Sequence, residues 1–152
     1  MTPVTQEHPY HDPGRGLHGD CYRAALASLL DLPLADVPHF LTYPKEQRRE
    51  VVREFLQPRG LIPVIVPGPV FMEAIVGSGI DCYHLILGKN GDCLHTCVGL
   101  NGSIVHDPSP PMPGVEWGLD GSLDDWEMVV FVKTFTEPSP PHVGDRSTEV
   151  TQ

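Results

Sequence analysis

Hydrophobic positions in the first third of the chain recur with the spacing of α-helices. After Asp20, apolar residues three and four positions apart fall on one helix face, and they are Tyr22, Ala25, Leu26, Leu29 and Leu30. Asp20 is a preferred N-cap residue, whose carboxylate can accept backbone N–H bonds from the first turn. Pro33 ends this helix, because proline lacks an N–H and clashes with the preceding turn. A second helix is expected within residues 45–60, where an apolar face alternates with charged positions before Pro58 and Gly60.

The second half of the chain has the β-branched and aromatic residues and the short apolar runs of strands. Strand-length runs cover residues 82–89, 93–100, 103–108 and 127–135. Asn-Gly pairs, which favour tight hairpin turns, separate the first three runs. A shorter strand is expected at 61–67, limited by its prolines, and a helix at 69–79. This order predicts an α+β domain in which N-terminal helices pack on a C-terminal antiparallel sheet.

The chain is long enough for one domain with its own core, which we expect over residues 1–136. Residues 1–18 are broken by prolines and glycines and are expected to be an irregular lead-in. A long loop rich in turn residues is expected at 108–126. Residues 137–152 have almost nothing to bury, which predicts a disordered tail.

Charge and composition narrow the range of partners and compartments. The formal net charge is -10, from 10 Lys and Arg against 20 Asp and Glu, which argues against nucleic acid and anionic membranes as partners. No apolar run approaches the ~18 residues of a membrane span. The N-terminus lacks the basic and apolar regions of a secretory signal, so a cytoplasmic location is expected. In that compartment the four cysteines are expected to remain thiols.

Cys21 lies where a helix can stabilise a thiolate. The free N–H groups and the dipole at a helix start favour negative charge, and a thiol placed there can become a nucleophile. The alternative is a small hydrophobe packed in the core. His95 lies on a strand, and the following hairpin brings Asp107 back towards it. A carboxylate there can accept the ring N–H and fix the tautomer, so these residues have the composition of a thiol hydrolase site.

Two segments carry a resemblance to a known family. "GDCYRAALASLL" and "HTCVGLNGSIVHDP" resemble the papain-like cysteine peptidase superfamily, in particular small phage-type proteins, and are similar to the peptidase domains that process bacteriocin leaders. The likeness covers about residues 4–108. It implies a papain-like fold, Cys21 as nucleophile, His95 as general base and acid, and Asp107 as the residue that orients the ring. It requires no metal or organic cofactor.

The resemblance also implies an oxyanion hole, built from the cysteine N–H and the amide of an upstream Gln. The usual short spacing falls here on Arg15, so Gln6 is the candidate, and it can reach only if residues 7–19 loop out. His18 is a second candidate donor. His18, His84 and Trp117 are candidates for lining a substrate cleft, although packing or surface roles would equally explain them.

Two rival interpretations remain. Cys93, His95 and Cys97 alternate along one strand, and Asp107 or His84 could supply a fourth zinc ligand. Against zinc, Cys93 and Cys97 would lie about 13 Å apart at ~3.3 Å per residue, too far for Zn–S bonds of ~2.3 Å, so no metal is expected. The other rival is an inert papain-like scaffold that binds proteins.

The sequence therefore favours a cysteine-dependent hydrolase that acts by acyl transfer on a peptide, isopeptide or amide bond. Its expected partner is a peptide or protein substrate. The residues indicate neither the particular substrate nor the oligomeric state.

Overall fold

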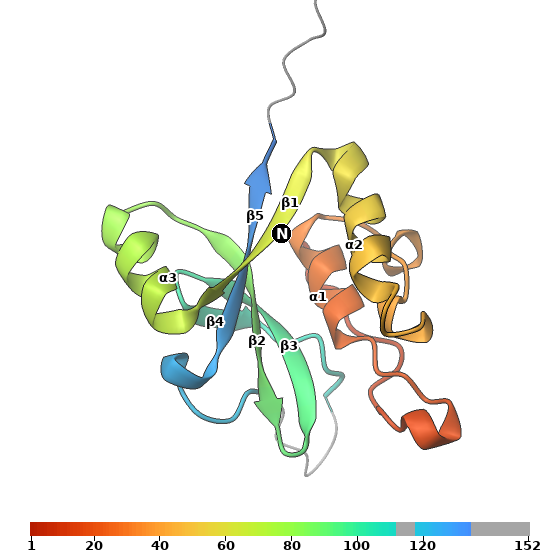
Figure 1. Cartoon of the computed structure of the whole chain (residues 1–152). Coiled ribbons are helices and arrows are strands. Elements are labelled where there is room, and N and C mark those ends of the chain that lie inside the picture. The colour runs from red at the N-terminus through yellow and green to blue at the C-terminus, as the bar shows by residue number, and fades with distance from the viewer. Residues whose placement is uncertain (112–117, 135–152) are drawn as a thin grey trace, which may run out of the picture.

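The computed structural model describes residues 1–111 and 118–134 of the chain. They form an α+β fold with an antiparallel sheet of five strands in the order β1-β5-β2-β3-β4 (Figure 1). The strands are β1 (Leu61–Pro67), β2 (Tyr83–Asn90), β3 (Cys93–Leu100), β4 (Ser103–His106) and β5 (Glu127–Lys133). The helices are α1 (Cys21–Leu29), α2 (Arg48–Leu56) and α3 (Gly68–Ala74). The predicted α+β class is therefore confirmed.

Tight turns connect the central strands, as the Asn-Gly pairs predicted. Gly91 has φ 57° between β2 and β3, and Asn101 and Gly102 have φ 53° and 83° between β3 and β4. Two consecutive residues with positive φ are the requirement of the hairpin turn that matches strand twist. This second hairpin sends the chain back along β3, which brings Asp107 beside the first half of that strand.

The first strand pairs with a strand that is distant from it in the sequence. β1 precedes α3, and it pairs along its whole length with β5 at the edge of the sheet. Pro63 and Pro67 are tolerated there because an edge strand needs only one of its two rows of hydrogen bonds. The strand expected at 61–67 is therefore confirmed, and long-range pairing with β5 gives it its place in the sheet.

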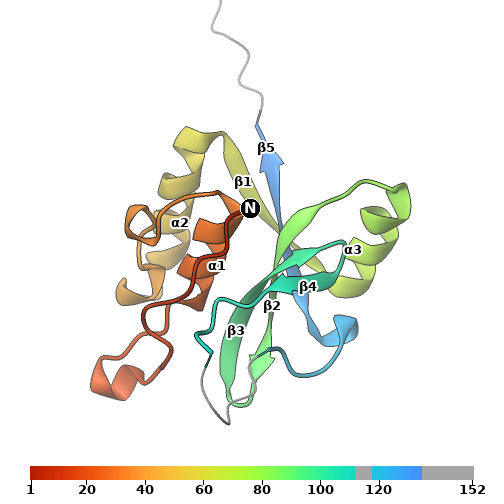
Figure 2. The same cartoon turned by 180° about the vertical axis from the view of Figure 1, so that it is seen from behind.

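The sheet is covered on both faces. One face packs against α1 through Leu85, Val98 and Val129. The alternate residues Ile86 and Met128 face the other way and pack with Phe71 of α3. Figures 1 and 2 show α1 and α2 on one side and α3 on the other. The predicted packing of N-terminal helices on the sheet is thus one half of the architecture, and α3 supplies the other layer.

Some expectations fall on parts of the chain that the structure does not describe. Trp117 and the tail at 137–152 lie outside the described residues, and so does the end of the proposed domain at 136. Within residues 1–111 and 118–134, no helix has the length and apolar character needed to cross a membrane.

Candidate active site

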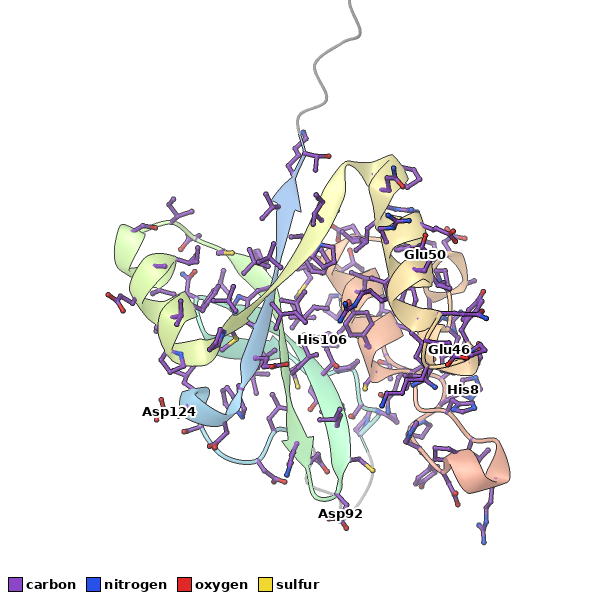
Figure 3. The ribbon with its side chains drawn as sticks, viewed as in Figure 1. His8, Glu46, Glu50, Asp92, His106 and Asp124 are labelled. Carbon is purple, nitrogen blue, oxygen red and sulfur yellow. The ribbon has the colours of Figure 1, made fainter. Side chains whose placement is uncertain are left out.

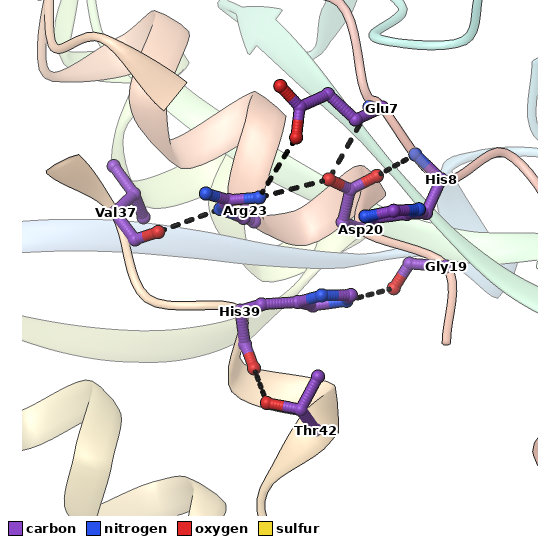
Figure 4. A network of polar contacts seen from close by, with 8 residues as sticks. All are labelled: Glu7, His8, Gly19, Asp20, Arg23, Val37, His39 and Thr42. Carbon is purple, nitrogen blue, oxygen red and sulfur yellow. Dashed lines mark hydrogen bonds and ion pairs between the residues drawn. The ribbon is translucent and has the colours of Figure 1, made fainter. Parts of the chain in front are cut away.

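A buried carboxylate ties the N-terminal segment to the start of α1. Asp20 accepts a hydrogen bond from the backbone N–H of His8 at 2.8 Å and a longer one from Glu7 at 3.4 Å. Its Oδ2 also lies 3.5 Å from the guanidinium of Arg23 (Figure 4). The side chain makes no capping bond to α1. The expected capping role of Asp20 is therefore wrong, because the incoming chain supplies N–H donors that outcompete the first turn.

This tie places Gln6 in the interior. The N–H of Asp20 donates to the carbonyl of His8, so the chain between them makes an excursion and returns. Gln6 donates its own N–H to the carbonyl of Pro108 at 2.8 Å and is only 7% exposed. Its side-chain oxygen is buried without a hydrogen-bond partner among the described residues. Gln6 could reach the site only if the residues between it and Cys21 looped out, and the bonds between His8 and Asp20 close such a loop.

His95 and Asp107 form the pair that the hairpin predicted. His95 is 7% exposed, and its Nε2 lies 2.9 Å from Oδ1 of Asp107. The N–H of Ser109 donates to the same oxygen at 2.8 Å, and the Ser109 hydroxyl lies 3.3 Å from Nε2. Sequence reasoning missed Ser109, although an aspartate commonly accepts a bond from the backbone N–H two residues later.

The thiols of Cys21 and Cys97 both interact with the ring of His95. Burial by itself lowers the pKa of His95, but hydrogen bonds to Asp107, Cys21 and Cys97 outweigh it and raise that pKa. Burial raises the pKa of Asp107, and the bonds from His95 and Ser109 reverse this and lower it. The ring and the carboxylate are thus favoured as a charged pair. Burial raises the pKa of the Cys97 thiol, whereas Cys21 is partly exposed.

His84 does not belong to this site. It is fully buried, its ring centroid lies 4.3 Å from that of Phe71, and its Nδ1 lies 3.0 Å from the carbonyl oxygen of Cys82. Burial lowers its pKa despite that hydrogen bond. The expectation that His84 lines an open cleft is therefore wrong, because strand alternation turns its ring into the core under α3.

His18 lines a cavity of about 280 Å³ in the loop that precedes Cys21. The other walls include His8, Leu17 and His39. The rings of His8 and His39 stack with centroids 5.5 Å apart, and Nε2 of His39 lies 3.2 Å from the carbonyl oxygen of Gly19 (Figure 4). Nδ1 of His18 is buried without a partner among the described residues. A role for His18 in a substrate cleft stays a prediction.

Four acidic side chains lie on the outer surface of the molecule and are not members of the candidate site (Figure 3). They are Glu46 in the turn before α2, Glu50 on α2, Asp92 at the β2–β3 turn and Asp124 in the short turn before β5. The site instead combines a thiol at a helix start, a buried imidazole and a carboxylate, with a buried carboxamide nearby, which is the set of groups that thiol-based acyl transfer uses. Comparisons of this chain with known protein families, with curated proteins and with solved structures found no match.

Proposed function

We propose that this protein is a papain-like cysteine hydrolase that acts by acyl transfer on a peptide, isopeptide or amide bond. The observation that carries the proposal is the shared contact of His95 with Asp107 and with Cys21 at the start of α1. A nucleophile within reach of a base, which a third group orients, is the arrangement of covalent catalysis. The three residues come from α1, β3 and the segment after β4.

In the proposed mechanism the Cys21 thiolate attacks the carbonyl carbon of the substrate. The resulting oxyanion accepts hydrogen bonds from the N–H of Cys21 and from the Gln6 carboxamide. Protonated His95 gives its proton to the leaving nitrogen as the C–N bond breaks, which leaves a thioester on Cys21. Neutral His95 then takes a proton from water as the water oxygen attacks the thioester carbon. The C–S bond breaks and the carboxylic acid product leaves, which restores the Cys21 thiolate beside protonated His95.

Gln6 is suited to the oxyanion role because its backbone position is fixed on both sides. Its N–H is bonded to Pro108, which follows Asp107, and its neighbours Glu7 and His8 are bonded to Asp20, which precedes Cys21. The segment that carries Gln6 is therefore attached both to the residues after Asp107 and to the residue before Cys21. The cavity beside His18 is the proposed place for a substrate side chain.

The first test compares two cysteines of the same protein. Cys93 is exposed at the start of β3, so it serves as an internal standard for an ordinary thiol. We expect iodoacetamide to modify Cys21 at least about 10-fold faster than Cys93 at neutral pH, with a chelator present and the sites identified by peptide mass spectrometry. His95→Gln should bring the rate of Cys21 down to that of Cys93, and His106→Gln, a change on β4, should not.

The second test asks for turnover. An activated ester such as p-nitrophenyl acetate should acylate Cys21, seen as an added acetyl mass, and the acyl group should then be hydrolysed. Cys21→Ala should abolish the adduct, and Gln6→Ala should slow acylation by about 10²-fold or more. Equal alkylation of Cys21 and Cys93, or an acetyl adduct that persists, would favour the inert protein-binding scaffold instead.

A further inference from the structure

Three metal-binding side chains converge beside the proposed nucleophile. His95 and Cys97 lie two residues apart on β3 and so share one face of the strand. Asp107 follows β4 and is brought to that face by the hairpin. One ligand atom of each residue lies within 4.8 Å of the other two. Cys97 is fully buried and His95 nearly so, which distinguishes this group from acidic clusters on the surface.

The chemistry of these donors favours zinc. An imidazole, a thiol and a carboxylate are all zinc ligands, whereas Mg²⁺ and Ca²⁺ prefer oxygen donors alone. Zinc bonds of about 2.0–2.3 Å place tetrahedral ligands about 3.3–3.8 Å apart. Donor atoms no more than 4.8 Å apart need only small side-chain movements to reach that spacing.

A second observation points to a cation at this place. Oδ2 of Asp107 is buried and has no hydrogen-bond partner among the described residues. An unpaired buried carboxylate oxygen costs free energy, which a bound cation would recover. Three protein ligands would leave one coordination position open, as in zinc sites that bind water or another small ligand.

We propose that His95, Cys97 and Asp107 form a zinc site that competes with the catalytic use of His95. Zinc would take the place of the ring proton between His95 and Asp107 and of the thiol proton of Cys97, so binding releases protons. This set differs from the one suggested by strand spacing, because Cys93 is exposed and His84 packs under α3. Zinc binding at these residues does not depend on the proposed function, whereas the inhibition of hydrolysis by zinc rests on it.

The test uses Zn²⁺ in competition with a chromophoric chelator, and Co²⁺ as a spectroscopic substitute. We expect one equivalent of Zn²⁺ to bind, and Co²⁺ to give a thiolate charge-transfer band. Cys97→Ser should remove the band and weaken Zn²⁺ binding at least about 10-fold. Cys93→Ser, on the same strand, is the matched control and should change neither. Asp107→Asn should weaken binding but retain the band, which gives a reading if Cys97→Ser folds poorly.

Cys21→Ala separates this proposal from the proposed function. That variant cannot be acylated at residue 21, yet it should keep the Co²⁺ band and a Zn²⁺ affinity close to that of the wild type. In the wild type, one equivalent of Zn²⁺ should slow the modification of Cys21, and a chelator should restore it. A wild type without a thiolate band, a Cys97→Ser variant that binds as tightly as the wild type, or loss of the band in Cys21→Ala or Cys93→Ser would overturn the proposed ligand set.

Discussion

Ser109 touches both members of the His95–Asp107 pair, with its N–H on the carboxylate and its hydroxyl near the ring. The N–H bond fixes one oxygen of Asp107, and the hydroxyl is a second polar neighbour of Nε2. At the scale of single residues, the orientation of the ring thus depends on Ser109 as well as on Asp107. Ser109 acts on His95 and is in this sense a positioning residue.

Ser109→Ala removes the hydroxyl and keeps the N–H bond to Asp107. We expect acylation of Cys21 by an activated ester to slow by roughly twofold to tenfold, the equivalent of one hydrogen bond of about 0.5–1.5 kcal/mol. Ser103→Ala, an exposed change at the start of β4, is the control. Stopped-flow acylation rates measure the effect, and a rate equal to that of the wild type would rule out the positioning role of Ser109.

At the scale of elements, α1 and the N-terminal segment form one unit. The segment lies along the helix, with Val4 bonded to Ser28 near one end and His8 bonded to Asp20 at the other. Asp20 is buried, and it faces Arg23, whose side chain is mostly buried as well. Loss of the Asp20 carboxylate would leave two backbone N–H groups without their acceptor and would leave Arg23 with only Glu7 and the carbonyl of Val37.

Asp20→Ala is therefore expected to lower the free energy of unfolding by roughly 2–4 kcal/mol. Because the same change frees Glu7 and His8, it should also slow acylation of Cys21 through the loss of Gln6 from its place. Asp12→Asn, in the exposed ion pair with Arg15, should change stability by less than about 1 kcal/mol. Urea titrations of the three proteins provide the comparison, and equal midpoints would contradict the structural role of Asp20.

Local patterns predicted the elements well, and the reason is visible in particular residues. The period of the apolar positions gave α1 and α2, and Asn101-Gly102 gave the hairpin that pairs His95 with Asp107. The contacts of Ser109 with His95, and the burial of Gln6, depend on segments that meet only in the folded chain. Likewise, the pairing of β1 with β5 joins residues that are 60 to 72 positions apart in the sequence, which no local pattern specifies.

At the scale of the whole molecule, the sheet has a core on each face, and the one under α3 contains a histidine. His84 packs against Phe71 and is fully buried. A Cβ atom at Gly99 would lie 2.5 Å from Nε2 of His84, so the glycine provides the space for the ring. Protonation of His84 would place a charge in this core, and burial accordingly lowers its pKa from 6.5.

His84 should therefore contribute a loss of stability in mild acid, whereas His95, whose pKa is raised in the folded chain, contributes in the opposite direction. Above pH 6.5 His84 is neutral in the folded and the unfolded chain and contributes no pH dependence. As the pH falls below 6.5, the unfolded chain takes up a proton that the folded chain refuses, and stability falls by up to about 1.4 kcal/mol per pH unit until the folded pKa is reached. His84→Leu should remove this contribution, so that between pH 7.5 and 5.5 the variant loses less stability, or gains more, than the wild type. Urea unfolding at the two pH values measures the difference, and the same change in both proteins would contradict the assignment.

The bond pair between His8 and Asp20 closes the excursion of residues 9–18 at its base. Insertions or deletions beyond that closure can therefore change the number of residues between glutamine and cysteine without displacing either one. A search that demands a fixed gap between the two would overlook such chains, whereas a search for the acidic residue directly before the cysteine would find them. The excursion can thus vary in length while the proposed reacting groups keep their positions.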